Sequence, residues 1–186
     1  MNEKDMQHGY EWGVEDLTGL FISEKMNGCR AYWDDSTLYS RGGIAVRVPQ
    51  YWREQLPQTP LDCELYDGID GVYRCGAAIR YGKFTDTMSL IVFDAPNVKG
   101  NWSERMAYAA EVTRGCSFVR CEQSQNCKNN EDAFKRLSCI QQHGGEGLML
   151  RHPTLEYSAG RTDKLLKLTP YILERFYDCN SALLAK

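Results

Sequence analysis

The first third of the chain consists of short stretches in which hydrophobic and polar residues alternate. These stretches lie at 19–23, 29–33, 37–40 and 44–46. Alternation with a period of two indicates strands with one buried face, and turn signals such as Asn27-Gly28 and Gly42-Gly43 separate them. We therefore predict an antiparallel sheet in this region.

The rest of the chain mixes helical and strand patterns. Further strands are predicted at 61–66, 89–93, 147–151 and 164–168. Helices are predicted at 49–55, 104–114, 129–143 and 173–176. The segment Asn101-Trp102-Ser103 precedes the second of these helices and contains a capping residue. The order favours an α+β domain of twisted antiparallel sheets flanked by helices.

Composition places the chain among ordinary globular proteins. It has 186 residues, of which 42% are hydrophobic and 25% are charged, and we expect a single domain over 1–186. No apolar stretch approaches the roughly 18 residues of a membrane span, and the polar N-terminus lacks an apolar run typical of a signal peptide. The sequence thus predicts a cytoplasmic protein with no membrane partner.

Charge and cysteine content narrow the possibilities further. The formal net charge is −3, so binding of nucleic acid would need a local basic face. Eight cysteines are scattered without a Cys-x-x-Cys pair, and we expect reduced, small core residues rather than zinc ligands or a disulfide framework. They are Cys29, Cys63, Cys75, Cys116, Cys121, Cys127, Cys139 and Cys179.

Charged residues recur at the ends of the predicted strands. Lys25 ends one strand directly before the Asn27-Gly28 turn, which alone is typical of a solvated edge charge. Alternation places Asp62 and Glu64 on one face, either a solvated face or one that binds a sugar hydroxyl or a metal-bound water. Taken together, an amine, carboxylates and further cations at strand edges are what phosphate chemistry with a divalent metal requires.

These segments resemble, in order, the nucleotidyltransferase motifs of ATP-dependent DNA ligases, especially the small bacterial and phage type. The matching segments are Ser23–Asp34 (motif I), Ser40–Gly43 (Ia), Leu61–Leu65 (III), Leu90–Pro96 (IIIa), Glu146–Arg151 (IV) and Lys164–Pro170 (V). The resemblance implies an ATP-grasp-like adenylation domain. Because few residues follow motif V, we expect no C-terminal OB-fold.

The resemblance also implies a three-step reaction with ATP and magnesium or manganese. Lys25 would attack the α-phosphate of ATP, AMP would pass to the 5′-phosphate at a nick, and a 3′-hydroxyl would displace AMP. It further implies how the nucleoside is held: Glu24 contacts adenine through its backbone, Phe93 stacks on the base, and Arg30 and Glu64 hold the ribose. By the same resemblance, Arg41 lies near the ribose or the nick phosphate, and Lys167, or alternatively Lys164, contacts the α-phosphate. Glu64 and Glu146 would bind the metal.

The implied partner is nicked duplex DNA, bound by a monomer that either works alone or receives an OB-fold in trans. The chain departs from the family pattern at Asn27 in place of Asp, Cys63 in place of Gly and Thr169 in place of Lys. Asn27 favours an RNA ligase as one alternative. A non-catalytic module that binds a nucleotide or a nick is the other.

Overall fold

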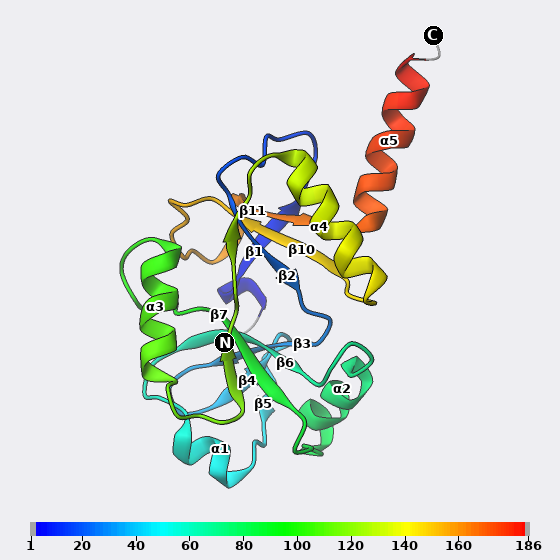
Figure 1. The fold of residues 1–186 in the computed structure, drawn as a ribbon. Helices are drawn as coiled ribbons and strands as arrows, with labels where there is room; N and C mark the ends of the chain where they lie inside the picture. Colours follow the sequence, from blue (N-terminus) through cyan, green and yellow to red (C-terminus); the bar gives the residue numbers. More distant parts are fainter. Residues whose placement is uncertain (1–2, 185–186) are drawn as a thin grey trace. The chain divides into compact units, whose positions relative to one another are not determined.

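The computed structural model describes residues 3–184, with side chains described for 3–177. The chain forms two compact units (Figure 1). The first contains the residues up to Gln7 together with Met26–Glu122 and Glu156–Gly160, and the second contains the remaining segments. That residues 1–186 act as one functional domain stays a prediction.

A six-stranded sheet organises the first unit, with the strand order β5-β4-β3-β6-β7-β8. Its strands are β3 (Cys29–Trp33), β4 (Leu38–Ser40), β5 (Ala45–Val46), β6 (Leu61–Tyr66), β7 (Ser89–Asp94) and β8 (Val119–Cys121). Its helices are η1 (Glu3–Asp5, a 3₁₀ turn), α1 (Gln50–Gln55), α2 (Val72–Tyr81) and α3 (Trp102–Val112). Neighbouring strands are antiparallel except β7 and β8, which are parallel.

One face of this sheet is apolar and the other is polar. Leu61, Cys63 and Leu65 of β6 pack into a core with Trp52 of α1 and Ala78 of α2. The alternate residues of the strands form what we call the polar face. It carries Arg30, Tyr32, Asp62, Glu64, Tyr66, Ser89, Phe93 and Arg120.

The second unit contains a five-stranded sheet with the order β1-β11-β10-β2-β9. Its elements are β1 (Gln7–Glu11), β2 (Phe21–Lys25), β9 (Gln125–Asn126), α4 (Asn130–Gln142), β10 (Gly147–Arg151), β11 (Gly160–Leu168) and α5 (Pro170–Leu184). Leu148 and Leu150 of β10 pack with Leu166 of β11 and with Ala133 and Leu137 of α4. This core closes one face of the sheet and leaves the face of Lys25 outside it.

Most predicted elements are confirmed, with ends that shift by a few residues. The sequence pattern located most of the strands. It missed β1, β8, β9 and α2, which are short or, in α2, polar at most positions. The closing helix was predicted too short, because α5 runs from Pro170 to Leu184.

The described cysteines are free thiols as predicted, but the expectation that all are core residues is wrong, because Cys139 is exposed. Seven are free thiols, while the side chain of Cys179 lies outside the described residues. Burial raises the pKa of the Cys116 and Cys121 thiols, so these groups stay protonated at neutral pH. Within residues 3–184, none of the helices combines the length and the apolar character needed to cross a bilayer.

Helix α3 is fixed to the end of β7 by buried polar contacts. Arg105 is 1% exposed and donates two hydrogen bonds to the Asp94 carboxylate, from Nε at 2.6 Å and from Nη2 at 2.9 Å. The indole of Trp102 donates to the Phe93 carbonyl at 2.8 Å. Asn101 caps the helix, and its side chain accepts from the Glu104 amide while Glu104 bonds back. The backbone of Phe93 is therefore held from one side by α3.

We expect Arg105→Met to lower the free energy of unfolding by about 3 to 5 kcal/mol, because it leaves the Asp94 carboxylate buried without its ion-pair partner. Urea denaturation followed by circular dichroism measures the change. Arg114→Ala is the control, because it breaks an exposed arginine–glutamate pair in the same helix region and should have little effect. Equal stabilities for the two variants would contradict this account of α3.

Candidate functional site

Lys25 is the last residue of β2, and its ammonium contacts the carboxylate of Glu146. The side chains are 24% and 36% exposed, respectively, so solvent reaches both groups. The pairing of β2 with β10 explains the contact, because Lys25 lies opposite Gly147, the residue after Glu146. The sequence therefore placed the amine correctly at a strand end, and the fold gives it a carboxylate partner.

Gly147 is required for this arrangement. A Cβ at this position would lie 2.6 Å from the carbonyl oxygen of Leu168 on the neighbouring strand, which is closer than real Cβ contacts. Only glycine lets β10 begin here beside the end of β11. The glycine of the segment Glu146–Arg151 thus has a steric reason that the sequence did not reveal.

Strand register places Lys167 on the same face of the sheet as Lys25. Met149 of β10 lies between them, opposite Ser23 on one side and Lys167 on the other. From strand spacing and rise, the two lysine Cα atoms are roughly 12 Å apart. We call Lys25, Glu146 and Lys167 the lysine group.

Two other predicted residues lie on the opposite face of this sheet. Lys164 lies three residues before Lys167 on β11, so its side chain projects from the other face of the sheet. Its ammonium donates to the Thr154 hydroxyl at 3.3 Å. Glu24 points toward the loop at Gly145, where an added Cβ would lie 2.9 Å from its carboxylate. The Glu24 side chain is thereby directed away from the Lys25 face, while its backbone remains in β2.

In the first unit, Arg30 and Asp62 form a bidentate ion pair across β3 and β6. Arg30 Nε and Nη2 donate to the two Asp62 oxygens at 2.7 Å and 2.6 Å, and Nη2 also donates to the Gln7 carbonyl at 2.9 Å. Burial alone would lower the Arg30 pKa, but the charge and hydrogen bonds of Asp62 outweigh it and raise that pKa. Asp62 is 0% exposed, so its interpretation as part of a solvated face is wrong.

Phe93 occupies a β-bulge beside this pair. Cys63 lies opposite Val92 and Asp62 lies opposite Asp94, which leaves Phe93 as the extra residue of β7. A bulge re-aims one side chain, and here the Arg30 guanidinium carbon lies 4.6 Å from the centroid of the Phe93 ring. The ring is only partly buried.

Glu64 lies directly opposite Arg30 in the pairing of β3 with β6. Its position depends on Gly28, where a Cβ would overlap the Leu65 carbonyl oxygen. The exposed Arg41 follows β4, donates its amide to the Arg30 carbonyl at 3.2 Å and pairs through its side chain with Glu3. We call Arg30, Asp62, Glu64 and Phe93 the arginine group.

Tyr157 is a member of this network that no sequence motif indicated. Its hydroxyl donates to Asp62 Oδ2 at 2.6 Å and accepts from the Gln7 amide at 3.3 Å. Burial raises the pKa of the phenol, and the Asp62 charge raises it further. It lies 95 residues from Asp62 in the sequence, so only the fold could reveal the contact.

The departures from the family pattern have local explanations. Cys63 is buried, and its thiol donates to the Ala31 carbonyl at 3.2 Å. The Thr169 hydroxyl accepts from the Ile172 amide at 3.4 Å at the start of α5. Asn27 is exposed in the turn after Lys25.

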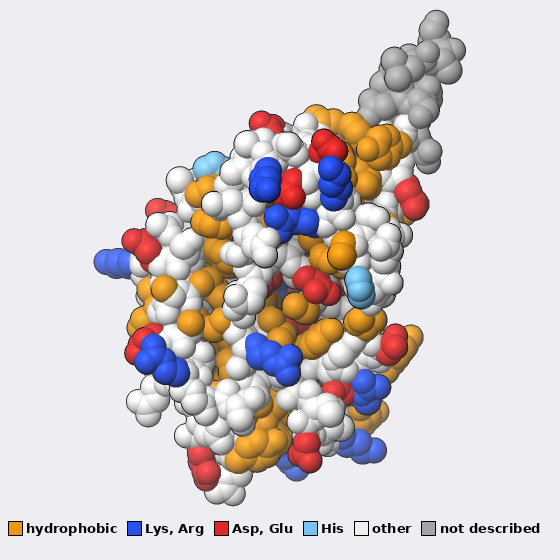
Figure 2. All heavy atoms as spheres, viewed as in Figure 1, with side chains coloured by type: hydrophobic (Ala, Val, Ile, Leu, Met, Phe, Trp, Pro, Cys, Tyr) orange, Lys and Arg blue, Asp and Glu red, His pale blue; other side chains and the backbone are white. Residues whose placement is uncertain are grey.

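On the face drawn in Figure 2, basic and acidic side chains are interspersed and do not form one broad basic surface.

The carboxylates suit magnesium bound together with phosphates. Among the described residues, His, Cys, Asp and Glu form no group of three that could hold a metal ion alone. Magnesium needs only one or two carboxylates when waters and substrate phosphates supply the remaining oxygens. Glu146 beside Lys25 is a carboxylate of this kind.

We expect the stability of the protein to fall as the pH rises from about 10 to about 12, in part because of Tyr32. Burial and the charge of Asp62 on the opposite strand raise the Tyr32 pKa from 10.0 to about 12. The unfolded chain loses this proton first, so the folded state loses stability across that interval. Tyr32→Phe should flatten the dependence, measured by urea denaturation at several pH values. An unchanged slope would contradict the assignment.

Comparison with known proteins places these features in a context. No protein-family model matches the chain. A DNA ligase of Haemophilus influenzae is 25% identical over 168 residues, which cover 88% of this chain and 63% of that protein. The chain therefore spans less than two thirds of the length of this curated relative.

Solved structures share the fold. A Lig E DNA ligase matches with a TM-score of 0.82 and 22% identity, covering 89% of this chain and 68% of that one. The ATP-dependent DNA ligase of bacteriophage T7, in complex with ATP, matches with a TM-score of 0.69 and 12% identity, covering 90% and 69%. The expected α+β fold and the resemblance inferred from the ordered motifs are confirmed.

Proposed function

We propose that this chain is an ATP-dependent DNA ligase, because it is similar to DNA ligases in sequence and in fold. The observation that carries the proposal is the contact between Lys25 and Glu146, at a strand end directly before a tight turn. The order of the other motifs along the chain supports it. This chain covers only part of the DNA ligase of Haemophilus influenzae, so the ligase activity assigned to it is our inference.

Lys25 is the nucleophile of the first step. An ammonium has no lone pair, so Lys25 must first release a proton, and Glu146 is the carboxylate in contact with it. The amine then forms a bond to the α-phosphorus of ATP, and the bond from that phosphorus to pyrophosphate breaks. The product is AMP bound to the lysine nitrogen. Lys167, on the same face of the sheet, can neutralise charge on the phosphate oxygens.

Two further displacements complete the reaction. A 5′-phosphate oxygen at the nick attacks the AMP phosphorus, and the bond to the Lys25 nitrogen breaks. The 3′-hydroxyl then attacks the 5′-phosphate, loses its proton and expels AMP. Each step exchanges one phosphorus bond for another, which suits a site built from cations and positioned carboxylates.

The arginine group is suited to hold the adenosine. Asp62 orients the Arg30 guanidinium, and the Arg30 Nη1 makes no hydrogen bond within the described part of the chain, so it can donate to a ribose oxygen. Glu64 can accept from a ribose hydroxyl. The partly exposed ring of Phe93 offers a surface for base stacking.

Magnesium, or manganese, would be held by Glu146 of the second unit or Glu64 of the first together with phosphate oxygens, and would neutralise phosphate charge. The chain's own carboxylates orient the reacting groups. We propose that both compact units serve one nucleotidyltransferase reaction on nicked duplex DNA. A monomer is assumed to act, alone or with an OB-fold supplied in trans.

The free cysteines support a location in a reducing compartment. All seven described thiols are unpaired with one another, which is typical of proteins in the cytoplasm. We therefore propose that the protein works there.

Lys25→Ala is expected to abolish covalent labelling by ATP carrying a labelled α-phosphate, because no amine remains to form the bond. The label is detected after denaturing electrophoresis and should be acid-labile in the unaltered protein. Lys135→Ala is the matched control, because it removes the lysine of an exposed Lys–Glu pair on α4 and should keep full labelling. Labelling of the Lys25 variant would exclude it as the nucleophile.

Nicked substrates separate the DNA ligase from its alternatives. We expect sealing of a nick in duplex DNA, measured by gel electrophoresis beside matched RNA and hybrid duplexes. Sealing of RNA ends alone would identify an RNA ligase, which Asn27 suggested. Binding of nicked DNA with no lysine labelling and no sealing would identify a non-catalytic module.

A further inference from the structure

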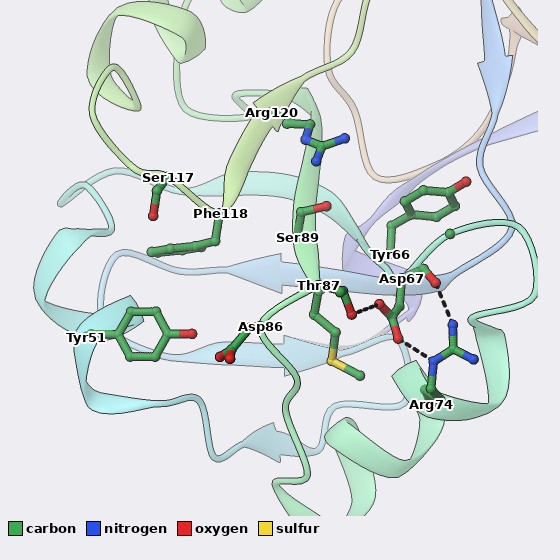
Figure 3. Close-up of a pocket in the computed structure, with 12 residues that line it drawn as sticks. Tyr51, Tyr66, Asp67, Arg74, Asp86, Thr87, Ser89, Ser117, Phe118 and Arg120 are labelled. Atoms are coloured by element: carbon green, nitrogen blue, oxygen red, sulfur yellow. Dashed lines mark hydrogen bonds and ion pairs between the residues drawn. The ribbon is translucent and has the colours of Figure 1, made fainter.

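A cavity of about 600 Å³ lies in the first unit, at the end of β6 and β7 that is remote from Phe93 (Figure 3). Its size falls in the range of small-molecule pockets. Residues from five segments of the unit line it. They are Tyr51, Tyr66, Asp67, Gly68, Arg74, Asp86, Thr87, Met88, Ser89, Ser117, Phe118 and Arg120.

Ser89 supplies a hydroxyl to the lining of this cavity. The residue is 4% exposed, and its hydroxyl makes no hydrogen bond within the described part of the chain. It lies directly opposite Tyr66 in the pairing of β6 with β7, and Figure 3 shows its oxygen directed into the space beside Tyr66. The Ser89 hydroxyl lines the cavity and can donate a hydrogen bond to a polar ligand atom there.

Arg120 brings a positive charge to the same end of the cavity. Arg120 lies on β8 opposite Ile91, and Ile91 follows Ser89 by two residues on β7, so all three lie on the polar face. The side chain is exposed and has no ion pair or hydrogen bond among the described residues. A guanidinium with free donors beside a free hydroxyl is a suitable binding site for a tetrahedral anion.

The acidic residues of the cavity do not cancel this charge. Asp67 accepts hydrogen bonds from Arg74 and from Thr87, the latter at 2.6 Å, so its charge is already compensated. Burial opposes ionisation of Asp67, but these hydrogen bonds and the Arg74 charge lower its pKa, and it stays ionised beside Arg74. Asp86 is exposed and lies on the side of Tyr51 in Figure 3.

We propose that this cavity binds a phosphate group, with Arg120 as the charge partner and the Ser89 hydroxyl as a hydrogen-bond donor. Ser89 lies four residues from Phe93 along β7, roughly 13 Å at the rise of a strand. The cavity is therefore a separate subsite on the polar face that also carries the arginine group. The phosphate belongs either to the DNA backbone, which rests on the proposed ligase function, or to a free nucleotide or inorganic phosphate.

Direct binding is tested by titrating the nitrogen-15-labelled protein with inorganic phosphate and, separately, with AMP. We expect the amide resonances of Ser89 and Arg120 to shift, and the shifts to be lost in Arg120→Ala. Acetate at equal ionic strength is the anion control and should leave them in place. Ser89→Ala should weaken the binding by a few-fold, the effect of one lost hydrogen bond.

The DNA arm measures the salt dependence of binding to a nicked duplex by fluorescence anisotropy. Loss of one phosphate contact should reduce the slope of log K against log salt by about 0.9 in Arg120→Ala. Arg114→Ala removes an equal charge that is already paired with Glu111, and should keep the slope. A reduced slope assigns the phosphate to DNA, while shifts with phosphate or AMP and an unchanged slope assign it to the free ligand.

Neither shifts nor a change in slope, or equal shifts with acetate, would overturn the proposal. Lysine labelling is measured in parallel on every variant and should stay at the level of the unaltered protein. A protein that fails to label at all does not act as a ligase on its own, yet the phosphate titration still decides the cavity. The two failures are thereby distinguishable.

Discussion

The buried ion pair of Arg30 and Asp62 is the constraint on which the polar face of the first unit depends. A carboxylate that is 0% exposed must be compensated, and here a guanidinium and the Tyr157 hydroxyl do so. The same guanidinium binds the Gln7 carbonyl and covers the Phe93 ring. One pair thus joins β3, β6 and β7 to two segments distant in sequence, and it fixes the side chain proposed to contact the ribose.

A second set of contacts fixes Phe93 from the other direction. Its carbonyl accepts from Trp102, and the next residue, Asp94, is bound by Arg105. The bulge at Phe93 interrupts the regular pairing, which would otherwise decide where its side chain points. Because both the backbone and the ring are held, the aromatic surface is preorganised for stacking, and little entropy remains to be lost on binding.

The strands and the strand-end residues were predictable because alternation and turn signals are local properties. Lys25 was placed from the residues around it alone. The bulge at Phe93 and the partner of Asp62 could not be predicted, since they depend on pairing between strands and on Tyr157, which is 95 residues away. Parallel β8 was missed for a related reason, because its three residues carry too short a pattern to identify a strand.

The substitution at Asn27 is explained by where the negative charge lies. The family pattern places an aspartate two residues after the lysine, and Asn27 removes that charge from an exposed turn. The Lys25 ammonium nevertheless contacts a carboxylate, which Glu146 supplies from the neighbouring strand. Strand pairing and the steric requirement at Gly147 hold this carboxylate in place, whereas a turn residue faces solvent. In the proposed reaction Glu146 would therefore be the proton acceptor beside the amine, without an acid in the turn.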